Sequence, residues 1–307
     1  MPAYRRPHGA DRPRPWLAAL LSLLRPGLGH VYVGRLGTGV AIWLGLLVAG
    51  IALLWIVSHR PGRVTTALLP IFTLGAPIAA AVHAWKVARQ PLRGPPRRPL
   101  AVLATVIGAL VVASRVAVPL KSWARRNIAD AKRVPSAAMG QTLALGDWIF
   151  LVPQGGRPLE RGQLVAFRHE GDILVKRLLA LDGDTIAMRE GVLVRNGLPQ
   201  DEPYAVMAGP PADDSASFAW QSLNLADRRL RDRYRPSADS WGPLIVPRGF
   251  GFVLGDNRHE SLDSRYFGWV SRDSIVGRPS VVYFSWSRDS SRVRWNRVGR
   301  AIPLRSH

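Results

Sequence analysis

The segment Gly171-Asp-Ile-Leu-Val-Lys-Arg-Leu-Leu-Ala-Leu-Asp-Gly-Asp184 holds an apolar run of strand length between two turn signals. Gly-Asp before the run and Asp-Gly-Asp after it are typical of tight turns. The segment therefore predicts a β-strand over Ile173–Leu181 that contains one lysine, Lys176. Burial of this ammonium would lower its pKa and make a neutral amine available as a general base. Taken alone, however, the strand favours an edge position in which Lys176 reaches solvent beside Arg177.

Other short apolar runs, separated by Gly, Pro and Asp turns, surround this segment and predict a mainly antiparallel β domain over residues 121–300. The other runs are Trp148–Val152, Leu164–Phe167, Thr185–Met188, Val192–Arg195, Leu244–Val246, Phe252–Leu254 and Val281–Trp286. From about Asp201 to Ser240 the sequence turns polar, with prolines and an arginine cluster at 228–235. We interpret residues 201–240 as an inserted cap between two parts of the β core.

The N-terminal part of the chain is different in character, with four apolar stretches over residues 16–120. Residues 36–57, 64–87 and 99–120 each reach the roughly 20 residues that a membrane-spanning helix requires. The first stretch, 16–34, is interrupted by Arg25 and Pro26, so it fits a spanning, re-entrant or interfacial segment. Residues 1–15 are basic and rich in proline, which predicts a disordered tail. The fold class expected is three or four transmembrane helices followed by the β domain.

The charge of the chain, formally +21, is concentrated around these apolar stretches. Up to Leu120 there are 14 Arg or Lys residues and one acid, a pattern that indicates membrane flanks rather than a nucleic-acid partner. The basic loop 88–98 is expected in the cytoplasm, which puts the β domain on the outer face if the first stretch does not cross. The chain has no cysteine, and no metal-ligand spacing or phosphate-binding glycine loop occurs. We therefore expect no metal and no cofactor.

Two further segments belong with the lysine segment: Val134-Pro-Ser-Ala-Ala-Met-Gly-Gln-Thr-Leu-Ala-Leu-Gly-Asp147 and Gly255-Asp-Asn-Arg-His-Glu-Ser-Leu-Asp-Ser-Arg-Tyr-Phe-Gly268. Together the three resemble the signature boxes of the type I signal peptidases, membrane-anchored Ser/Lys serine endopeptidases of bacteria. The likeness covers most of residues 130–285. The last box matches at every specified position, and the lysine box matches through Val175-Lys-Arg and Gly183-Asp. In the first box the matching residues are Pro135, Ser136, Met139, Thr142, Leu143, Gly146 and Asp147.

The resemblance implies a role for each matching residue. Lys176 would be the general base, and Ser261 would hydrogen-bond its amine and orient it. Ser136 would contribute to an oxyanion hole with the backbone N–H of residue 138. Asp263 and Arg265 would form an ion pair that shapes the site, although a turn cap at Ser261 and a weak surface pair are the plainer alternatives. The remaining positions expected to be structural at the site are Met139, Asp256, Asn257 and Arg258.

The first box departs from the signature at its catalytic position, because Ala138 stands where the family has its nucleophilic serine. A methyl group cannot form an acyl-enzyme. Ser136 is a possible surrogate, but positions two apart in extended chain lie roughly 6.5 Å apart, too far to keep the same lysine contact. Thr142, Ser264 and His259 are poorer candidates. Two further departures, Gln141 for the proline of the box and Gln163 for a usual aspartate, favour natural drift over a single engineered change.

Two functions follow from these features. The first is a signal peptidase that removes signal peptides from exported preproteins by a Ser/Lys mechanism. The alternative is a catalytically inactive homologue that binds signal peptides or membrane proteins without cleaving them. Either way, the resemblance implies a multi-pass protein of the bacterial inner membrane whose partners are signal peptides and the lipid bilayer. A cytoplasmic autoprotease fits poorly with three or more spans, and the sequence leaves the oligomeric state open.

Overall fold

The computed structural model describes residues 13–90, 99–210 and 215–303. The chain divides into two compact units. A helical unit comprises Met1–Val57 and Val64–Arg125, and a β unit comprises Ser58–Arg63 and Arg126–His307. The two units are described separately below.

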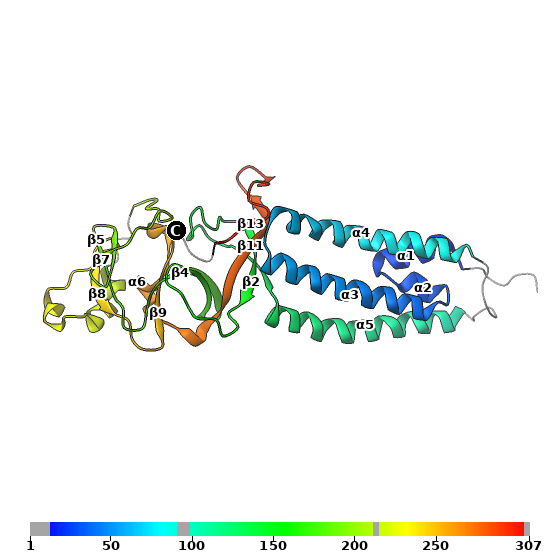
Figure 1. Cartoon of the computed structure of the whole chain (residues 1–307), viewed down its shortest axis with the longest axis horizontal. Helices are drawn as coiled ribbons and strands as arrows, with labels where there is room; N and C mark the ends of the chain where they lie inside the picture. The colour runs from blue at the N-terminus through cyan, green and yellow to red at the C-terminus, as the bar shows by residue number, and fades with distance from the viewer. Residues whose placement is uncertain (1–12, 91–98, 211–214, 304–307) are drawn as a thin grey trace, which may run out of the picture. The chain divides into compact units, whose positions relative to one another are not determined.

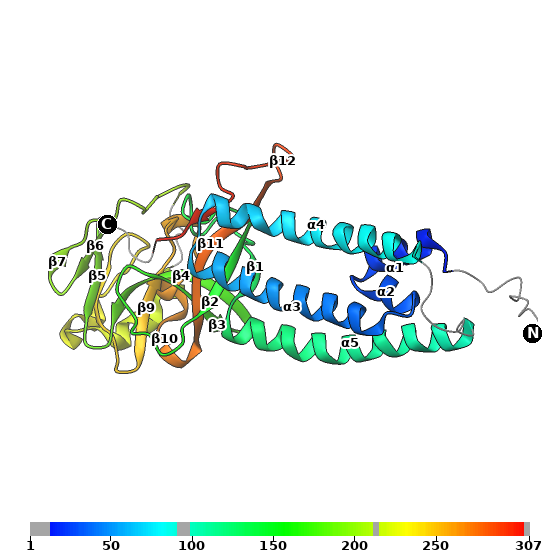
Figure 2. The same cartoon turned by 45° about the vertical axis from the view of Figure 1, so that its right-hand side comes forward.

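Three long helices dominate the helical unit, and α3 lies between α4 and α5 in both views (Figures 1 and 2). All three are long and apolar enough to cross a membrane. The third expected span, 99–120, lies within α5, which continues through the charged residues after Leu120 to Asn127. The helices of this unit are α1 Pro15–Leu24, α2 Leu28–Tyr32, α3 Leu36–His59, α4 Arg63–Ala88 and α5 Pro99–Asn127.

The first apolar stretch is a pair of short helices, α1 and α2, broken at Arg25–Gly27. Gly27 adopts φ 96°, a left-handed conformation that a side chain would strain. With 10 and 5 residues, neither helix alone reaches across a bilayer. Both pack against the end of α4 through a small apolar cluster. The structure thus shows no single spanning helix here, and re-entry stays a prediction. Of the expected disordered tail, residues 1–12 lie outside the described residues, whereas Pro15 already begins α1.

A large sheet forms the centre of the β unit, with strand order β1-β2-β11-β3-β4-β9-β10 and antiparallel pairing between all neighbours. Two short strands, β12 and β13, pair with β11 outside this path. β4 is an interior strand bonded to β3 and β9, so the edge position expected for Lys176 is wrong. The strands are β1 Asp130–Arg133, β2 Asp147–Pro153, β3 Leu164–His169, β4 Asp172–Leu181, β9 Phe250–Leu254, β10 Val270–Ser271, β11 Ile275–Ser287, β12 Arg292–Val293 and β13 Arg300–Ala301.

A second, four-stranded antiparallel sheet has the order β7-β6-β5-β8. Its apolar face shares one core with β4 and β9, where Trp241 packs on Phe252 with ring centroids 5.1 Å apart. The connection from β7 to β8 contains the expected cap, and its described part holds two 3-10 helices and no strand. These elements are β5 Thr185–Arg189, β6 Val192–Arg195, β7 Leu198–Pro199, β8 Trp241–Ile245, η1 Ser215–Asn224 and η2 Arg228–Arg233.

Two short elements after β9 carry the last signature segment, η3 Arg258–Glu260 and α6 Ser264–Phe267, and η4 Arg272–Ser274 lies beyond it, after β10. The first residues of the cap contact this segment. The backbone N–H of Val206 donates to the Asp256 carbonyl at 2.7 Å, and the Val206 carbonyl accepts from the backbone N–H of Arg258 at 2.8 Å. Because successive strand residues point to opposite faces, β4 directs the neighbouring Lys176 and Arg177 to different partners. Both partners come from the loop that follows β9.

Candidate active site

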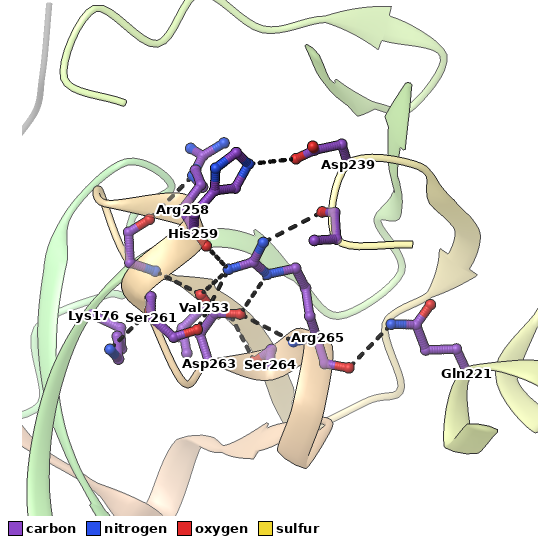
Figure 3. A network of polar contacts seen from close by, with 12 residues as sticks. Lys176, Gln221, Asp239, Val253, Arg258, His259, Ser261, Asp263, Ser264 and Arg265 are labelled. Carbon is purple, nitrogen blue, oxygen red and sulfur yellow. Dashed lines mark hydrogen bonds and ion pairs between the residues drawn. The ribbon is translucent and has the colours of Figure 1, made fainter. Parts of the chain in front are cut away.

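Lys176 lies in the middle of β4, and its side chain is almost fully buried at 5% exposure. Its Nζ donates a hydrogen bond of 2.9 Å to Oγ of Ser261, which is also buried. Ser261 directly follows η3, and Figure 3 shows the lysine reaching it from the neighbouring strand. The two residues that the sequence pairs as base and orienting hydroxyl are therefore in direct contact.

The surroundings of Lys176 make its ammonium less stable than in water. Burial lowers the pKa of Lys176 to about 8, and the Asp263 carboxylate opposes part of that shift. The neighbouring Arg265 guanidinium lowers the pKa further. With a pKa about one unit above neutrality, about a tenth of the amines are uncharged at pH 7. The expected direction of the shift is present, and the neutral amine becomes the major form only above about pH 8.

Ala138 is buried in the loop between β1 and β2, and its backbone carbonyl lies close to Ser261. Its carbonyl accepts a hydrogen bond of 3.1 Å from the backbone N–H of Asn257. A Cβ added at Gly255 would lie 2.5 Å from that carbonyl oxygen and 2.1 Å from Ser261 Oγ. Glycine at 255 is thus what lets the backbone of Ala138 approach Ser261. Ser261 thus contacts the Lys176 amine and lies close to the backbone of Ala138, and the catalytic roles that the resemblance implies stay predictions.

Ser136, two residues earlier, occupies a different position. Its side chain is exposed and lines a groove of about 100 Å³ together with Lys176. Within the described residues its hydroxyl makes no hydrogen bond, so no Ser136–Lys176 contact exists in this conformation. The other walls of the groove come from β1, β2, β4 and the intervening loop, and most are apolar: Val134, Met139, Leu143, Ile149, Leu151, Ile173 and Val175.

The Asp263–Arg265 pair is buried, with both side chains at 0% exposure, so a weak surface pair is the wrong description. Two parallel hydrogen bonds of 2.9 Å join the guanidinium to the carboxylate. Asp263 also accepts from the Gly255 amide at 3.0 Å and caps α6. Burial alone would raise the pKa of Asp263, but the Arg265 guanidinium holds it below its usual range. Figure 3 shows this guanidinium at the centre of the network that fixes the Ser261 loop.

A second buried ion pair anchors the loop of Ala138 from the other side of β4. Arg177 donates to Asp256 through two hydrogen bonds of 2.8 and 2.6 Å, and Tyr204 of the cap covers the guanidinium at 3.7 Å. Asp256 also accepts from the Thr142 hydroxyl at 2.6 Å. Thr142 is therefore engaged away from Lys176. These contacts place Asp256 in the support of the site rather than in its groove.

The remaining expected site residues have structural partners as well. Met139 is buried in the apolar cluster beneath the groove. Arg258 is buried and pairs with Glu202 of the cap at 2.6 Å. Asn257 donates through its side chain to Glu260 at 2.8 Å. His259 has an acid partner that the sequence did not suggest, Asp239 at 3.1 Å, but both belong to the contact between η3 and the cap.

Two of the sequence departures are also visible in the structure. Gln141 is exposed, and only its backbone carbonyl is used, as an acceptor for arginines of the C-terminal segment. Gln163 is buried, and its Nε2 has no hydrogen-bond partner among the described residues. Ser264, a poorer nucleophile candidate from the start, accepts from the Val253 amide at 3.0 Å and is fully buried. None of the three contacts Lys176.

Sequence reasoning missed the residues that hold Asp147, the last position of the first box. This carboxylate is fully buried and receives Arg297 through three contacts, the two longer ones at 3.0 and 3.1 Å. Arg294 and the Ser285 hydroxyl also donate hydrogen bonds to this carboxylate. Arg297 also donates to the carbonyls of Gln141 and Thr142. The C-terminal segment therefore fixes the middle and the C-terminal end of the loop that contains Ala138.

Replacement of Arg297 by glutamine is expected to lower the free energy of unfolding of the β unit by about 2–3 kcal/mol, because Asp147 stays buried without its main cation. Thermal unfolding of the full chain in detergent, followed by near-UV circular dichroism, measures the change. Arg300→Gln is the matched control, since Arg300 contributes only one bond of 3.3 Å to the Gln141 carbonyl. Equal melting of the two variants would mean that Arg297 does not hold the loop.

Comparison with known proteins gives one family. The family model described as "Signal peptidase, peptidase S26" matches residues 103–286, from within α5 to the end of β11. This range includes Lys176, Ser261 and Ala138, whereas Arg294 and Arg297 lie beyond it.

Similar proteins include "Probable signal peptidase I-2" of Synechocystis sp., 30% identical over 178 residues, which cover 55% of this chain and 69% of that protein. "Signal peptidase IB" of Staphylococcus aureus is 32% identical over 131 residues, 42% of this chain and 63% of the relative. Among solved structures, a signal peptidase I from Enterococcus faecalis V583 is 28% identical. It matches 40% of this chain and 97% of its own, with a TM-score of 0.29.

Proposed function

This chain belongs to the signal peptidase family, peptidase S26, and we propose that it binds the signal peptides of exported preproteins in the Lys176 groove without cutting them. The observation that carries this proposal is the contrast between an intact lysine environment and Ala138. Lys176, Ser261, Asp263 and Arg265 are buried and mutually bonded. The position beside them offers only a methyl group, so no acyl-enzyme forms there.

The groove suits an extended peptide with small apolar side chains. Its walls are mostly apolar, with Lys132 and Arg133 beside them, and its volume of about 100 Å³ favours small residues over aromatic ones. A peptide lying along the exposed backbone of β1 would add a strand to the sheet, because β1 is the edge strand of the described order. The residue next to Lys176 would then be the one that an active relative attacks.

The proposed location follows from the helical unit. Three helices are long and apolar enough to cross a bilayer, and the loop 88–98 is the densest basic connection between them. We place that loop in the cytoplasm by the positive-inside rule, which puts the β unit on the outer face of a bacterial inner membrane. A signal peptide emerging on that face meets the groove directly.

One observation favours cleavage as a second candidate function. Ser136 is exposed in the same groove as Lys176, so its hydroxyl has access to a bound peptide. Its lack of a contact with Lys176 in the described structure speaks against it as nucleophile, because activation requires hydrogen-bond distance. A shift of the loop on peptide binding would be needed.

A binding and cleavage assay on the full chain separates these functions. Reconstituted in liposomes, the chain is expected to bind a fluorescent preprotein and to leave it uncut, as read by anisotropy and gel. Ile173→Trp, which fills the groove, is expected to weaken binding about tenfold or more, about 1.4 kcal/mol. Val192→Trp on the exposed face of β6 is the matched control and is expected to bind normally.

Each other outcome has a definite meaning. Cleavage that Ser136→Ala abolishes would establish the shifted nucleophile and refute the non-cleaving role. Equal binding by the Ile173 and Val192 variants would show that preproteins do not use this groove.

A further inference from the structure

A cavity of about 380 Å³ lies in the helical unit between α2, α3 and α5. Its walls are aliphatic side chains, glycines and Trp43, and among the described residues Arg25 is the one charged residue that lines it. The guanidinium of Arg25 lies 6.0 Å from the ring centroid of Trp43. The cavity therefore combines an apolar space with a single cation, which is the chemistry of a site for an amphiphile with a negative head.

The cation in this cavity has no carboxylate nearby in sequence. No Asp or Glu occurs between Asp11 and Asp130, so residues 12–129 include basic side chains but no acidic ones. In the described part of the chain, Arg25 forms no ion pair. An arginine held beside apolar side chains is costly unless an anion neutralises it. That anion has to come from outside these residues.

The position of the cavity along the helices indicates which kind of anion pairs with Arg25. Its α3 residues belong to the first turns of the helix, from Leu36 to Trp43, and its α5 residues follow the start of the candidate span at Val106. Trp43 and Arg25 are thus at one end of the spans, where indoles and arginines meet lipid headgroups. This is the end joined to the basic loop 88–98, and basic pockets between helices on the cytoplasmic side bind anionic lipid heads.

We propose that this cavity binds one anionic phospholipid, with its phosphate on Arg25 and an acyl chain along Trp43 and Gly108. A basic segment of a client is disfavoured by the charge of Arg25. The site is separate from the Lys176 groove, and the inference rests on the proposed membrane orientation but not on what that groove binds.

The headgroup contact is tested by native mass spectrometry of the full chain in detergent, titrated with phosphatidylglycerol or with phosphatidylcholine of the same acyl chains. The wild type is expected to retain more phosphatidylglycerol, and Arg25→Gln to lose that retention about tenfold, since a charge-assisted bond is removed. Arg89→Gln is the matched control. Arg89 also lies over a tryptophan, Trp85, at 3.6 Å, but it does not line the cavity.

The acyl-chain contact has its own pair of variants. A Cβ added at Gly108 or at Gly75 meets no atom within 4 Å, so leucine fits at either position. Of these two glycines, Gly108 lines the cavity and Gly75 does not. Gly108→Leu is expected to reduce phosphatidylglycerol retention, and Gly75→Leu to leave it unchanged.

Three results would overturn the site. Equal retention of the two lipids by the wild type would exclude recognition of the anionic head. Equal losses of phosphatidylglycerol retention in the Arg25 and Arg89 variants would show that general surface charge, not this cavity, holds the lipid. Wild-type retention by Gly108→Leu would show that the lipid chain lies elsewhere, even if the Arg25 variant failed to fold.

Discussion

Replacing Ala138 by serine is expected to convert this chain into a working peptidase, raising preprotein cleavage by roughly 10⁴-fold or more over the unaltered chain. The reason is that the rest of the catalytic arrangement is already in place. The Lys176 amine is buried and held by Ser261 at 2.9 Å, and the backbone of residue 138 lies against the same serine. A hydroxyl on that residue would have a base of suitable pKa beside it.

The pH dependence of the Ala138→Ser variant identifies the base. Only the neutral amine accepts a proton, and burial lowers the pKa of Lys176 to about 8. Cleavage is therefore expected to rise about tenfold per pH unit below about pH 8 and to level off above it. Initial rates on a preprotein in liposomes, measured between pH 6 and about pH 10, give the profile.

The control is the double variant Ala138→Ser with Lys176→Met, which keeps the hydroxyl and the approximate volume but removes the base. It is expected to return to the background rate. A folded Ala138→Ser variant that leaves the preprotein intact would mean that the groove has lost the geometry of its family. Activity that survives Lys176→Met would exclude this lysine as the base.

Replacing Asp263 by alanine is expected to destabilise the β unit by about 3–5 kcal/mol, because Arg265 is left buried as an unpaired cation. Both side chains are at 0% exposure, and Asp263 also holds the Gly255 amide and the first turn of α6. Thermal unfolding of the full chain in detergent, followed by near-UV circular dichroism, should show a clear drop in Tm. The variant Asp263→Glu, which keeps a carboxylate at this position, is expected to show a smaller drop in Tm.

The chain contains a matched control for this prediction. Asp227 and Arg229 repeat the arrangement, an aspartate that caps a short helix and pairs with the arginine two residues later. This second pair is exposed to solvent, so Asp227→Ala is expected to leave the Tm almost unchanged. Similar effects of the two substitutions would show that burial does not set the strength of the Asp263 pair.

Much of the fold could be read from the sequence, since its elements depend on local patterns. Each expected apolar β run overlaps a strand, and the three long spans appear as α3, α4 and α5. The errors arise where tertiary contacts override composition. The polar run 130–133 becomes β1 because it pairs with β2. Hydropathy marks only the apolar segment 99–120 and does not show that the helix continues through charged residues to Asn127.

The site was predictable only as far as its motifs extend. The resemblance brought Lys176 and Ser261 together, and their contact agrees with it. No local pattern could show that Arg297 pairs with Asp147, because 150 residues separate them. Likewise, the spacing of Asp263 and Arg265 is the same as that of Asp227 and Arg229, and only the three-dimensional structure distinguishes a buried pair from an exposed one.

The contact between Asp147 and Arg297 also affects the order in which this protein matures. A chain is made from its N-terminus, and a loop of 150 residues must close before this ion pair forms. The segment with Ala138 therefore emerges early but lacks its anchor until residue 297 has been synthesised and delivered to the same side of the membrane. A partly made chain thus has its lysine strand before the loop that contains Ala138 is anchored to the C-terminal segment.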